Sequence, residues 1–103
     1  MEDKYKLRYL PLFEEELIDI ANHIKYNLQN PSAADNLVTE VEKAIIKRSH
    51  SPLSFEPCYS AYDREHDYYR IYVKNYVVYY VVIDDVMEIR RIVYNRRDRD
   101  KLI

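Results

Sequence analysis

The sequence contains no glycine and no tryptophan among its 103 residues, and it contains a single cysteine. The absence of glycine excludes a glycine-rich phosphate-binding loop, a dinucleotide-binding fingerprint and a nucleophile elbow, because each of these motifs requires glycine. The lone cysteine, Cys58, can form neither an internal disulfide nor a cysteine zinc site. We therefore expect no metal and no cofactor, a cytoplasmic protein, and a small buried side chain at Cys58.

Long hydrophobic runs and an excess of one charge are also missing. The longest apolar run, residues 76–83, is far too short to cross a bilayer, and the N-terminus has no apolar stretch of signal-peptide length. The 16 basic residues nearly balance the 18 acidic ones, and 48% of the residues are hydrophobic. This balance is typical of a globular protein. We expect one domain over residues 1–103 and no membrane association.

A strand and two amphipathic helices are predicted in the N-terminal half. Residues 5–9 alternate between apolar and basic side chains, which indicates a half-buried strand that ends at Pro11. Apolar residues then recur at helical spacing over residues 12–28, and again from residue 31 to about residue 49. Asn30 is a typical N-cap for the second helix. Because so few residues separate the helices, we expect an antiparallel helical hairpin.

The C-terminal half predicts a sheet. Residues 52–67 show no sustained periodicity and predict a loop, and three β-branched and aromatic runs follow at 69–73, 76–83 and 86–94. Two-residue links without glycine join these runs, so tight turns would place Asn or Asp at positive φ. The whole pattern predicts an α+β fold. In it, an N-terminal strand and an antiparallel helical hairpin pack on an antiparallel sheet with a three-stranded C-terminal meander.

Charge is divided unevenly along the chain. Residues 1–68 carry 8 basic and 13 acidic side chains, whereas residues 69–103 carry 8 basic and 5 acidic ones. Arg90 and Arg91 lie in the last predicted strand, where neighbours face opposite sides, so one of them should point toward the helices or the sheet edge. An arginine cluster suits phosphate or carboxylate groups through its planar donors. The alternative is an edge strand that charge protects from aggregation.

Tyrosines are concentrated near these arginines, since nine of the twelve lie from Tyr59 onward. Tyrosines interleaved with arginines can stack nucleobases or anchor a protein partner. Packing within the sheet is the simpler interpretation for most of them, with Tyr94, beside the basic tail, as the exception. The three histidines have no metal-ligand spacing, and the pair Asp84 and Asp85 is interpreted as a turn.

Four segments, taken together and in order, resemble the toxins of the RelE/ParE superfamily, which are the toxic half of bacterial type II toxin–antitoxin modules. These segments are YKLRYLPLFEEELIDIANHI, NPSAADNL, YYRIYVKNYVVYYVV and VMEIRRIVYNRRD. The resemblance covers nearly the whole chain. It implies a plasmid-stabilisation type of module, growth arrest by the toxin, the same fold as above, and a cognate antitoxin that binds and neutralises the toxin.

Two activities occur within this superfamily. Toxins that resemble RelE cleave mRNA on the ribosome without a metal, whereas those that resemble ParE inhibit DNA gyrase. In the ribonuclease branch a catalytic arginine usually follows the tyrosine of the second meander strand, but this chain has Val77 after Tyr76. Tyr94 also replaces a histidine that is often found in this superfamily just before the arginine-rich C-terminal motif, here RRD. The resemblance therefore favours a gyrase inhibitor; an mRNA endonuclease is the alternative, and a non-toxic interaction domain is a third hypothesis.

The resemblance also implies the site residues. In a ribosome-dependent nuclease, Arg70, Arg96 and Arg97 would stabilise the phosphate charge, and Tyr94 would orient the base. In a gyrase inhibitor, basic side chains would form a target-binding surface instead. That surface would comprise Arg91, Arg96, Arg97, Arg99 and Lys101.

Overall fold

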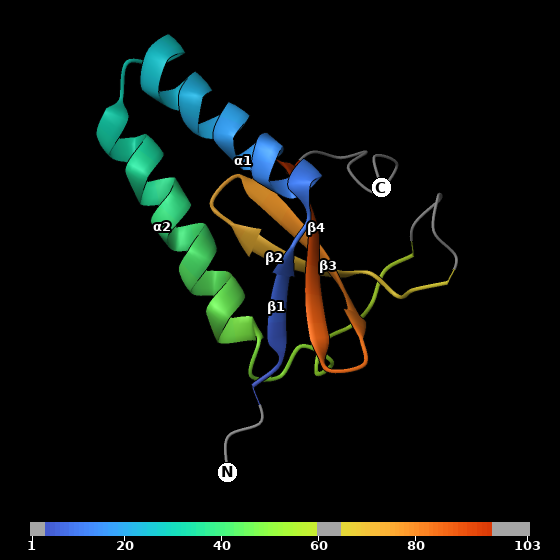
Figure 1. Ribbon diagram of the computed structural model, residues 1–103. Coiled ribbons are helices and arrows are strands. Elements are labelled where there is room, and N and C mark those ends of the chain that lie inside the picture. The colour runs from blue at the N-terminus through green and yellow to red at the C-terminus, as the bar shows by residue number, and fades with distance from the viewer. Residues whose placement is uncertain (1–3, 60–64, 96–103) are drawn as a thin grey trace.

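The structure of the protein is a computed structural model, and it describes residues 4–59 and 65–95. Figure 1 shows two layers, a helical hairpin and a sheet, with the hairpin lying against one side of the sheet. The elements within the described ranges are β1 (Lys6–Tyr9), α1 (Pro11–Asn22), the π-helical turn η1 (His23–Asn27), α2 (Pro31–Arg48), β2 (Tyr69–Val73), β3 (Tyr76–Ile83) and β4 (Val86–Tyr94).

The two predicted helices are confirmed, with one difference at the end of the first. Pro11 occupies the first turn of α1, where its missing N–H costs nothing. The helix then widens into the π-turn, in which the N–H of Leu28 donates to the carbonyl of His23 (3.1 Å). Gln29 takes a left-handed φ of 53° and reverses the chain in place of a glycine. The side chain of Asn30 caps α2 as predicted, because it accepts the N–H of Ala33 (3.2 Å).

The sheet has the order β1-β4-β3-β2, and the predicted C-terminal meander is confirmed. One part of the prediction needs correction, because the sheet is mixed and not antiparallel throughout: β1 runs parallel to β4, with Leu7 opposite Met87. Two-residue turns force β2, β3 and β4 to be antiparallel, whereas β1 joins the sheet through the helical hairpin and lacks that constraint.

The meander turns behave as predicted at one link and differently at the other. Asp84 takes a positive φ of 56°, as expected for an aspartate in a tight turn. In the first link the lysine takes this conformation, since Lys74 has a φ of 52°. A chain without glycine thus adopts left-handed backbone at ordinary residues.

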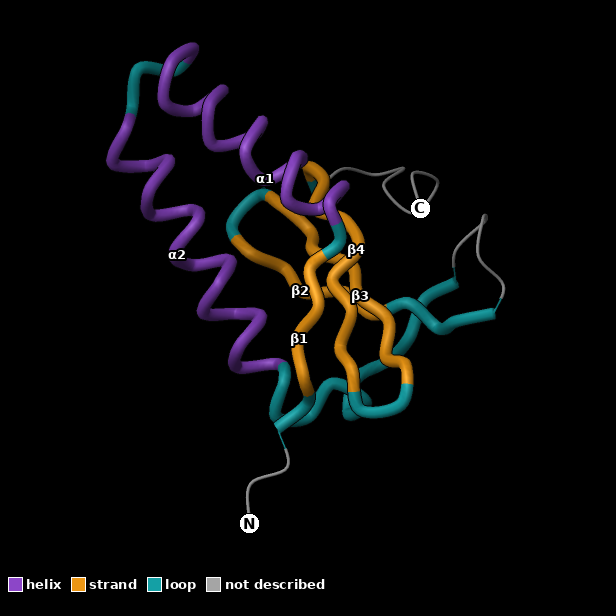
Figure 2. The backbone as a smooth tube through the Cα atoms, in the orientation of Figure 1, coloured by secondary structure: helices purple, strands orange, loops and turns teal. Residues whose placement is uncertain are grey.

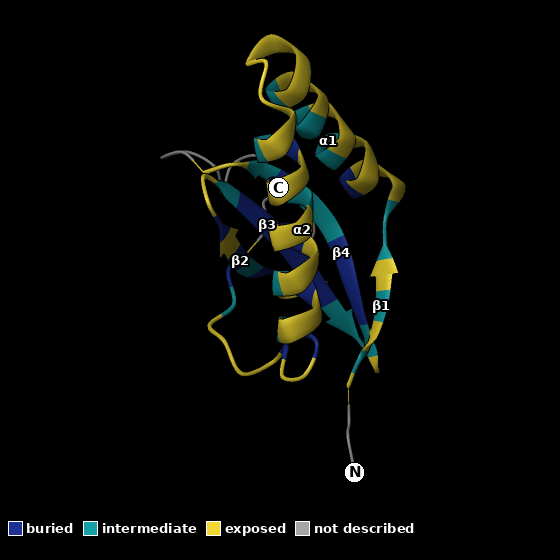
Figure 3. Ribbon diagram, turned by 90° about the vertical axis from the view of Figure 1, so that its left-hand side faces the viewer, coloured by how far each residue is buried: buried dark blue, intermediate teal, exposed yellow. Residues whose placement is uncertain are grey.

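The main core lies between the hairpin and the sheet. Phe13, Leu37, Val41 and Ile45 of the helices pack against the inward side chains of the strands, such as Ile89. Figure 3 shows this arrangement, with exposed residues on the outer sides of both helices and buried ones along the strands behind them. The helical periodicity read from the sequence therefore marks the buried face correctly.

A second, smaller cluster lies on the opposite face of the sheet. It consists of Cys58, Tyr68, Val77, Tyr79 and Val81. The loop between α2 and β2 reaches this face, and Figure 2 shows it running past the ends of the strands to the side away from α2. Cys58 of the predicted loop and Tyr68, directly after that loop, form an isolated bridge through two backbone hydrogen bonds of 2.6 and 2.9 Å. Cys58 is buried, as expected for a small apolar side chain.

The start of this loop is held by Arg48 at the end of α2. Its guanidinium donates to the carbonyl of Arg70 (3.1 Å) and to the hydroxyl of Tyr80 (2.9 Å). The Tyr80 hydroxyl in turn donates to the carbonyl of Pro52 (2.8 Å), and the Arg48 guanidinium stacks 3.5 Å above the Phe55 ring. One cation therefore ties the helix, the sheet and the loop together.

Candidate functional site

The sheet face that lies away from the helices carries a set of arginines, here called the arginine face: Arg8, Arg70, Arg90 and Arg91. Arg70 and Arg91 lie on either side of Tyr79 in one row of register pairs, and Arg8 lies in a second row that includes Val81. Side chains in one row share a face of the sheet. Because Tyr79 and Val81 pack in the second cluster, these arginines originate on the face opposite to the hairpin.

A β-bulge interrupts the pairing of β4 with β3 at Arg90, directly before Arg91. Tyr79 is paired with Arg91 and Tyr80 with Ile89, so Arg90 is the additional residue of the bulge. In a flat strand without a bulge, the two arginines would point in opposite directions. The expectation that one of them points toward the helices or the sheet edge is confirmed, because Arg91 contacts Glu16 of α1 while Arg90 contacts Tyr68 of the second cluster.

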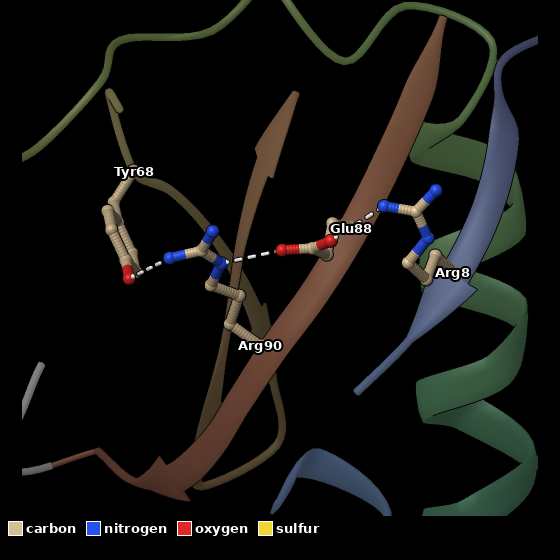
Figure 4. Close-up of polar contacts among 4 residues, drawn as sticks. All are labelled: Arg8, Tyr68, Glu88 and Arg90. Carbon is tan, nitrogen blue, oxygen red and sulfur yellow. Dashed lines mark hydrogen bonds and ion pairs between the residues drawn. The ribbon is translucent and has the colours of Figure 1, made fainter. Parts of the chain in front are cut away.

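Glu88 links two members of the arginine face into a chain of polar contacts that also includes Tyr68 (Figure 4). Its carboxylate accepts from Arg8 Nη1 (3.0 Å) and from Arg90 Nε (2.9 Å), and Arg90 Nη1 donates to the Tyr68 hydroxyl (2.9 Å). Glu88 is only 6% exposed. Two guanidinium groups around one carboxylate leave this cluster with a net positive charge.

The electrostatics of Glu88 favour the ionised carboxylate. Burial alone would raise its pKa, but the hydrogen bonds from Arg8 and Arg90 outweigh burial, so the pKa lies below its ordinary value. The arginines are therefore held in fixed positions at neutral pH. A preformed cation surface of this kind loses little side-chain entropy when it binds an anionic partner.

Arg91 turns over the edge of β4 toward Glu16 of α1. Arg91 Nε donates to both carboxylate oxygens (2.9 and 3.1 Å), Nη2 donates to Oε2, and the backbone N–H of Ile92 donates to Oε1 (3.0 Å). The hydrogen bonds from Arg91 to Glu16 raise the arginine's pKa more than its burial lowers it. Arg91 therefore anchors α1 to β4, and its predicted role in target binding stays a prediction.

The other predicted site residues are not brought together within the described part of the chain. Arg70 is half-buried on the arginine face, whereas Tyr94 lies in register with Tyr76, which packs on the helical side of the sheet. The Tyr94 and Tyr76 rings form an edge-to-face pair with centroids 5.8 Å apart. Val77 is fully buried in the second cluster. The remaining predicted residues, Arg96, Arg97, Arg99 and Lys101, lie outside the described residues.

The expectation that most tyrosines pack within the sheet is correct for Tyr69, Tyr79 and Tyr80, which are buried. Tyr94 is exposed as expected, but Tyr59 and Tyr72 are exposed as well. Sequence reasoning missed the acidic partners of the arginines. A glutamate inside an apolar strand was the available signal for Glu88, but its partner Arg8 lies 80 positions away, and no local pattern connects them.

Two grooves flank α1. The first, about 680 Å³, lies between α1 and α2 and has an apolar floor with Glu14 and Glu42 among its lining residues. Burial raises the pKa of the Tyr9 hydroxyl in this groove, and the charge of Glu42 raises it further. The second groove, about 660 Å³, lies on the other side of α1 against the end of β4, where Tyr94 lines it. Each groove is large enough to hold side chains of a protein partner.

Two further findings concern residues 4–59 and 65–95 only. No group of three or more His, Cys, Asp or Glu side chains is arranged to hold a metal ion there. None of the helices in these ranges combines the length and the apolar character needed to cross a membrane.

Comparisons with known proteins agree with this architecture. The profile of the family described as "ParE toxin of type II toxin-antitoxin system, parDE" matches residues 7–99. Among solved structures, a chain from "Chromosomal ParDE TA system from P. aeruginosa" superposes with a TM-score of 0.73 at 12% sequence identity, covering 91% of this chain and 99% of that one. At this identity the likeness shows the fold alone. A search of curated proteins finds no significant match.

Proposed function

Because the chain belongs to the ParE toxin family of type II toxin–antitoxin systems, we propose that it arrests bacterial growth by inhibiting DNA gyrase. The toxin class and the existence of a cognate antitoxin follow from the family. The molecular target, the surfaces used and action in the cytoplasm, where gyrase works on DNA, are the proposal.

The observation that carries the proposal is the position of Val77. The ribonuclease branch of the superfamily usually has a catalytic arginine there, and this chain has a fully buried aliphatic side chain that cannot touch a phosphate. Arg70 and Tyr94, the described members of the nuclease set, lie on opposite faces of the sheet. Phosphate-transfer chemistry needs cationic donors that converge on one site. The described residues lack that convergence, which supports binding over catalysis.

The arginine face supplies the surface for such binding. Arg8 is 55% exposed while its Nη1 is fixed by the buried Glu88, so its guanidinium is both accessible and oriented. An oriented, positively charged surface fits an acidic patch on a protein target. We also assign the residues of the basic tail, Arg96, Arg97, Arg99 and Lys101, to target binding.

A supercoiling assay with purified gyrase, relaxed plasmid and purified toxin tests the proposal. We expect supercoiling to stop in proportion to toxin concentration, while RNA 5′ ends mapped in cells shortly after induction show no new cuts. New ends at fixed codon positions with unimpaired gyrase would establish the mRNA endonuclease instead. If induction does not arrest growth, the third hypothesis, a non-toxic interaction domain, applies.

We further propose that a helix of the antitoxin binds in the groove between α1 and α2. The floor of this groove is formed by Phe13, Leu17 and Ile45, and it suits the apolar stripe of an amphipathic helix. Glu14 and Glu42 favour lysine or arginine on either side of that stripe. Copurification of tagged toxin with the product of the adjacent small open reading frame tests for the complex.

A further inference from the structure

Arg8 is the most exposed member of the arginine face, yet its guanidinium is held from the buried side. Arg8 lies opposite Glu88 in the register of β1 and β4, so the two side chains share one face of the sheet. Arg8 Nη1 donates to Glu88 Oε1 (3.0 Å), and the side chain of Glu88 is only 8% exposed. A largely buried acceptor therefore fixes a cation that is itself more than half exposed.

Glu88 can hold this cation because its own carboxylate is fixed. Its second oxygen, Oε2, accepts from Arg90 Nε (2.9 Å), and Arg90 Nη1 donates to the Tyr68 hydroxyl (2.9 Å). These contacts form one chain from β1 through β4 to the residue that precedes β2 (Figure 4). Because each oxygen serves a different arginine, rotation of the carboxylate would break both hydrogen bonds. The orientation of Arg8 is thus set by contacts that reach across the sheet.

Lys6, two residues earlier on β1, provides a contrast. It originates on the same face as Arg8, because alternate residues of a strand point to the same side. Lys6 Nζ lies 3.6 Å from the Asp85 carboxylate, and the two side chains are 77% and 68% exposed. Ion pairs that are this exposed are screened by water and hold neither side chain in one conformation. Arg8 is therefore oriented in a way that Lys6 is not.

The hydrogen bond to Glu88 determines which nitrogens of Arg8 a partner can use. A guanidinium carries five N–H donors in a planar fork, and Glu88 accepts from one that belongs to Nη1. Nε and Nη2 of Arg8 have no partner among the residues that the structure describes. The N–H groups on that edge of the fork are parallel, so they match the two oxygens of a carboxylate or a phosphate.

The rest of the face favours a protein carboxylate over the phosphates of DNA. Binding to DNA draws on several cations at once, because affinity comes from neutralising a row of phosphates. Arg90 and Arg91 are mostly buried, and each already pairs with a glutamate. The chain as a whole is also slightly acidic, with a formal net charge of -2. An exposed, oriented guanidinium suits one acidic side chain in a protein interface, where arginine is often a hot spot.

We propose that Glu88 is a positioning residue, which presents the Nε and Nη2 edge of Arg8 to a carboxylate on the target protein. This inference rests on the proposed inhibition of gyrase. It adds the chemistry of the contact and the residue that sets its geometry. Recognition at Arg8 then depends on the shape of the guanidinium and not on its charge alone.

The charge-conserving variant Arg8→Lys tests the two-point contact. Calorimetric titration of gyrase without DNA gives the affinities of the wild type, Arg8→Lys, Arg8→Ala and Lys6→Ala. We expect Arg8→Lys to bind as weakly as Arg8→Ala, about fivefold to tenfold below the wild type, and Lys6→Ala to stay within about twofold. Wild-type affinity of Arg8→Lys would overturn the inference.

Two further outcomes separate DNA binding from failure of the proposed function. The same variants are titrated with plasmid DNA alone. If the wild type binds this DNA and Arg8→Lys weakens that binding, phosphates are the partner and the inference is overturned. A wild type that neither binds gyrase nor inhibits supercoiling would instead contradict the proposed function.

A double-mutant cycle tests the positioning role of Glu88. Glu88→Gln keeps the shape of the side chain but removes the charge that holds Arg8. We expect it to weaken gyrase binding about threefold to fivefold when Arg8 is present and not at all in the Arg8→Ala background, because Glu88 acts through Arg8. Equal losses in both backgrounds would overturn the inference, since Glu88 would then act only on the fold.

The orientation of Arg8 can also be measured in the toxin alone. Relaxation of the Arg8 Nε signal in NMR reports how far the guanidinium moves on the picosecond to nanosecond timescale. We expect restricted motion in the wild type and large-amplitude motion in Glu88→Gln, with the exposed Lys6 ammonium mobile in both. Large-amplitude motion of Arg8 in the wild type would overturn the inference whether or not the toxin binds gyrase.

Discussion

Arg91 of β4 and Glu16 of α1 form an ion pair in which the carboxylate also receives the backbone N–H of Ile92. One side chain of the first helix therefore satisfies both a guanidinium and an open backbone donor of the last strand. The side chains of Arg91 and Glu16 are only 26% and 19% exposed, respectively. This contact joins parts of the chain that lie 75 positions apart and fixes the position of α1 over the sheet.

Replacing Glu16 with alanine should destabilise the fold. The change removes the Glu16 acceptor from a half-buried guanidinium and from the Ile92 N–H, and losing such contacts typically costs about 1–3 kcal/mol. Urea unfolding followed by circular dichroism measures the loss. Glu15→Ala is the matched control, since Glu15 is an exposed neighbour on the same helix. Equal unfolding free energies for the two variants would show that the pair contributes nothing to stability.

The pattern of apolar residues predicts most of the fold because local periodicity reflects burial. The stripe over residues 12–28 and the β-branched and aromatic run at 76–83 each locate an element that the structure contains. The π-turn at His23–Asn27 and the parallel placement of β1 do not follow from such patterns. Both depend on how the hairpin packs against the sheet, which is a tertiary effect.

The candidate site is less predictable for the same reason. Arginines at Arg90 and Arg91 are visible as a cluster, but the β-bulge that sends them to different partners is not. In the sequence, Glu16 is one of several charges on a predicted helix and Glu88 is one charge within a predicted strand. Only folding brings the two glutamates within hydrogen-bond distance of the arginines, where Glu88 accepts from Arg90 and Glu16 accepts from Arg91.

The depressed pKa of Glu88 predicts a pH dependence of stability. Its pKa in the folded state lies below the ordinary value of 4.5, so its contribution is fully present above that value and is lost as pH falls through the folded pKa. Urea unfolding at a series of pH values from neutral to 3 should therefore show a steeper loss below about 4.5 for the wild type than for Glu88→Gln. Parallel curves would mean that Glu88 has the same pKa in the folded and unfolded states.

Replacing Arg8 with alanine should weaken gyrase inhibition. The variant removes an oriented, exposed cation but leaves Glu88 paired with Arg90, so the fold should persist. We expect the concentration needed for half-inhibition of supercoiling to rise about fivefold to tenfold, and we expect inhibition to weaken further at higher salt. Lys43→Ala, an exposed cation on α2, is the control. Equal inhibition by both variants would place the target surface elsewhere.

The double substitution Arg96→Ala and Arg97→Ala tests the sequence-based prediction for the basic tail. Removing two cations should lower toxicity while the thermal unfolding of the described domain stays unchanged, because the resemblance assigns these side chains to the target and not to the core. Growth after induction, compared at equal protein level, gives the measurement. Undiminished growth arrest by the double variant would refute the assignment of these arginines to the target-binding surface.

Ile18→Glu should separate toxicity from neutralisation. Ile18 is 58% exposed at the first groove, so the free toxin should still fold and arrest growth. In the complex, however, the new carboxylate would be buried against the apolar stripe of the antitoxin helix and beside Glu14. We expect antitoxin affinity to fall by about tenfold to a hundredfold. Calorimetric titration measures that loss, and coexpression should no longer rescue growth. Leu12→Glu, an exposed apolar position of α1 outside the lining of the groove, is the matched control. Full rescue of the Ile18→Glu toxin would exclude this groove as the docking site.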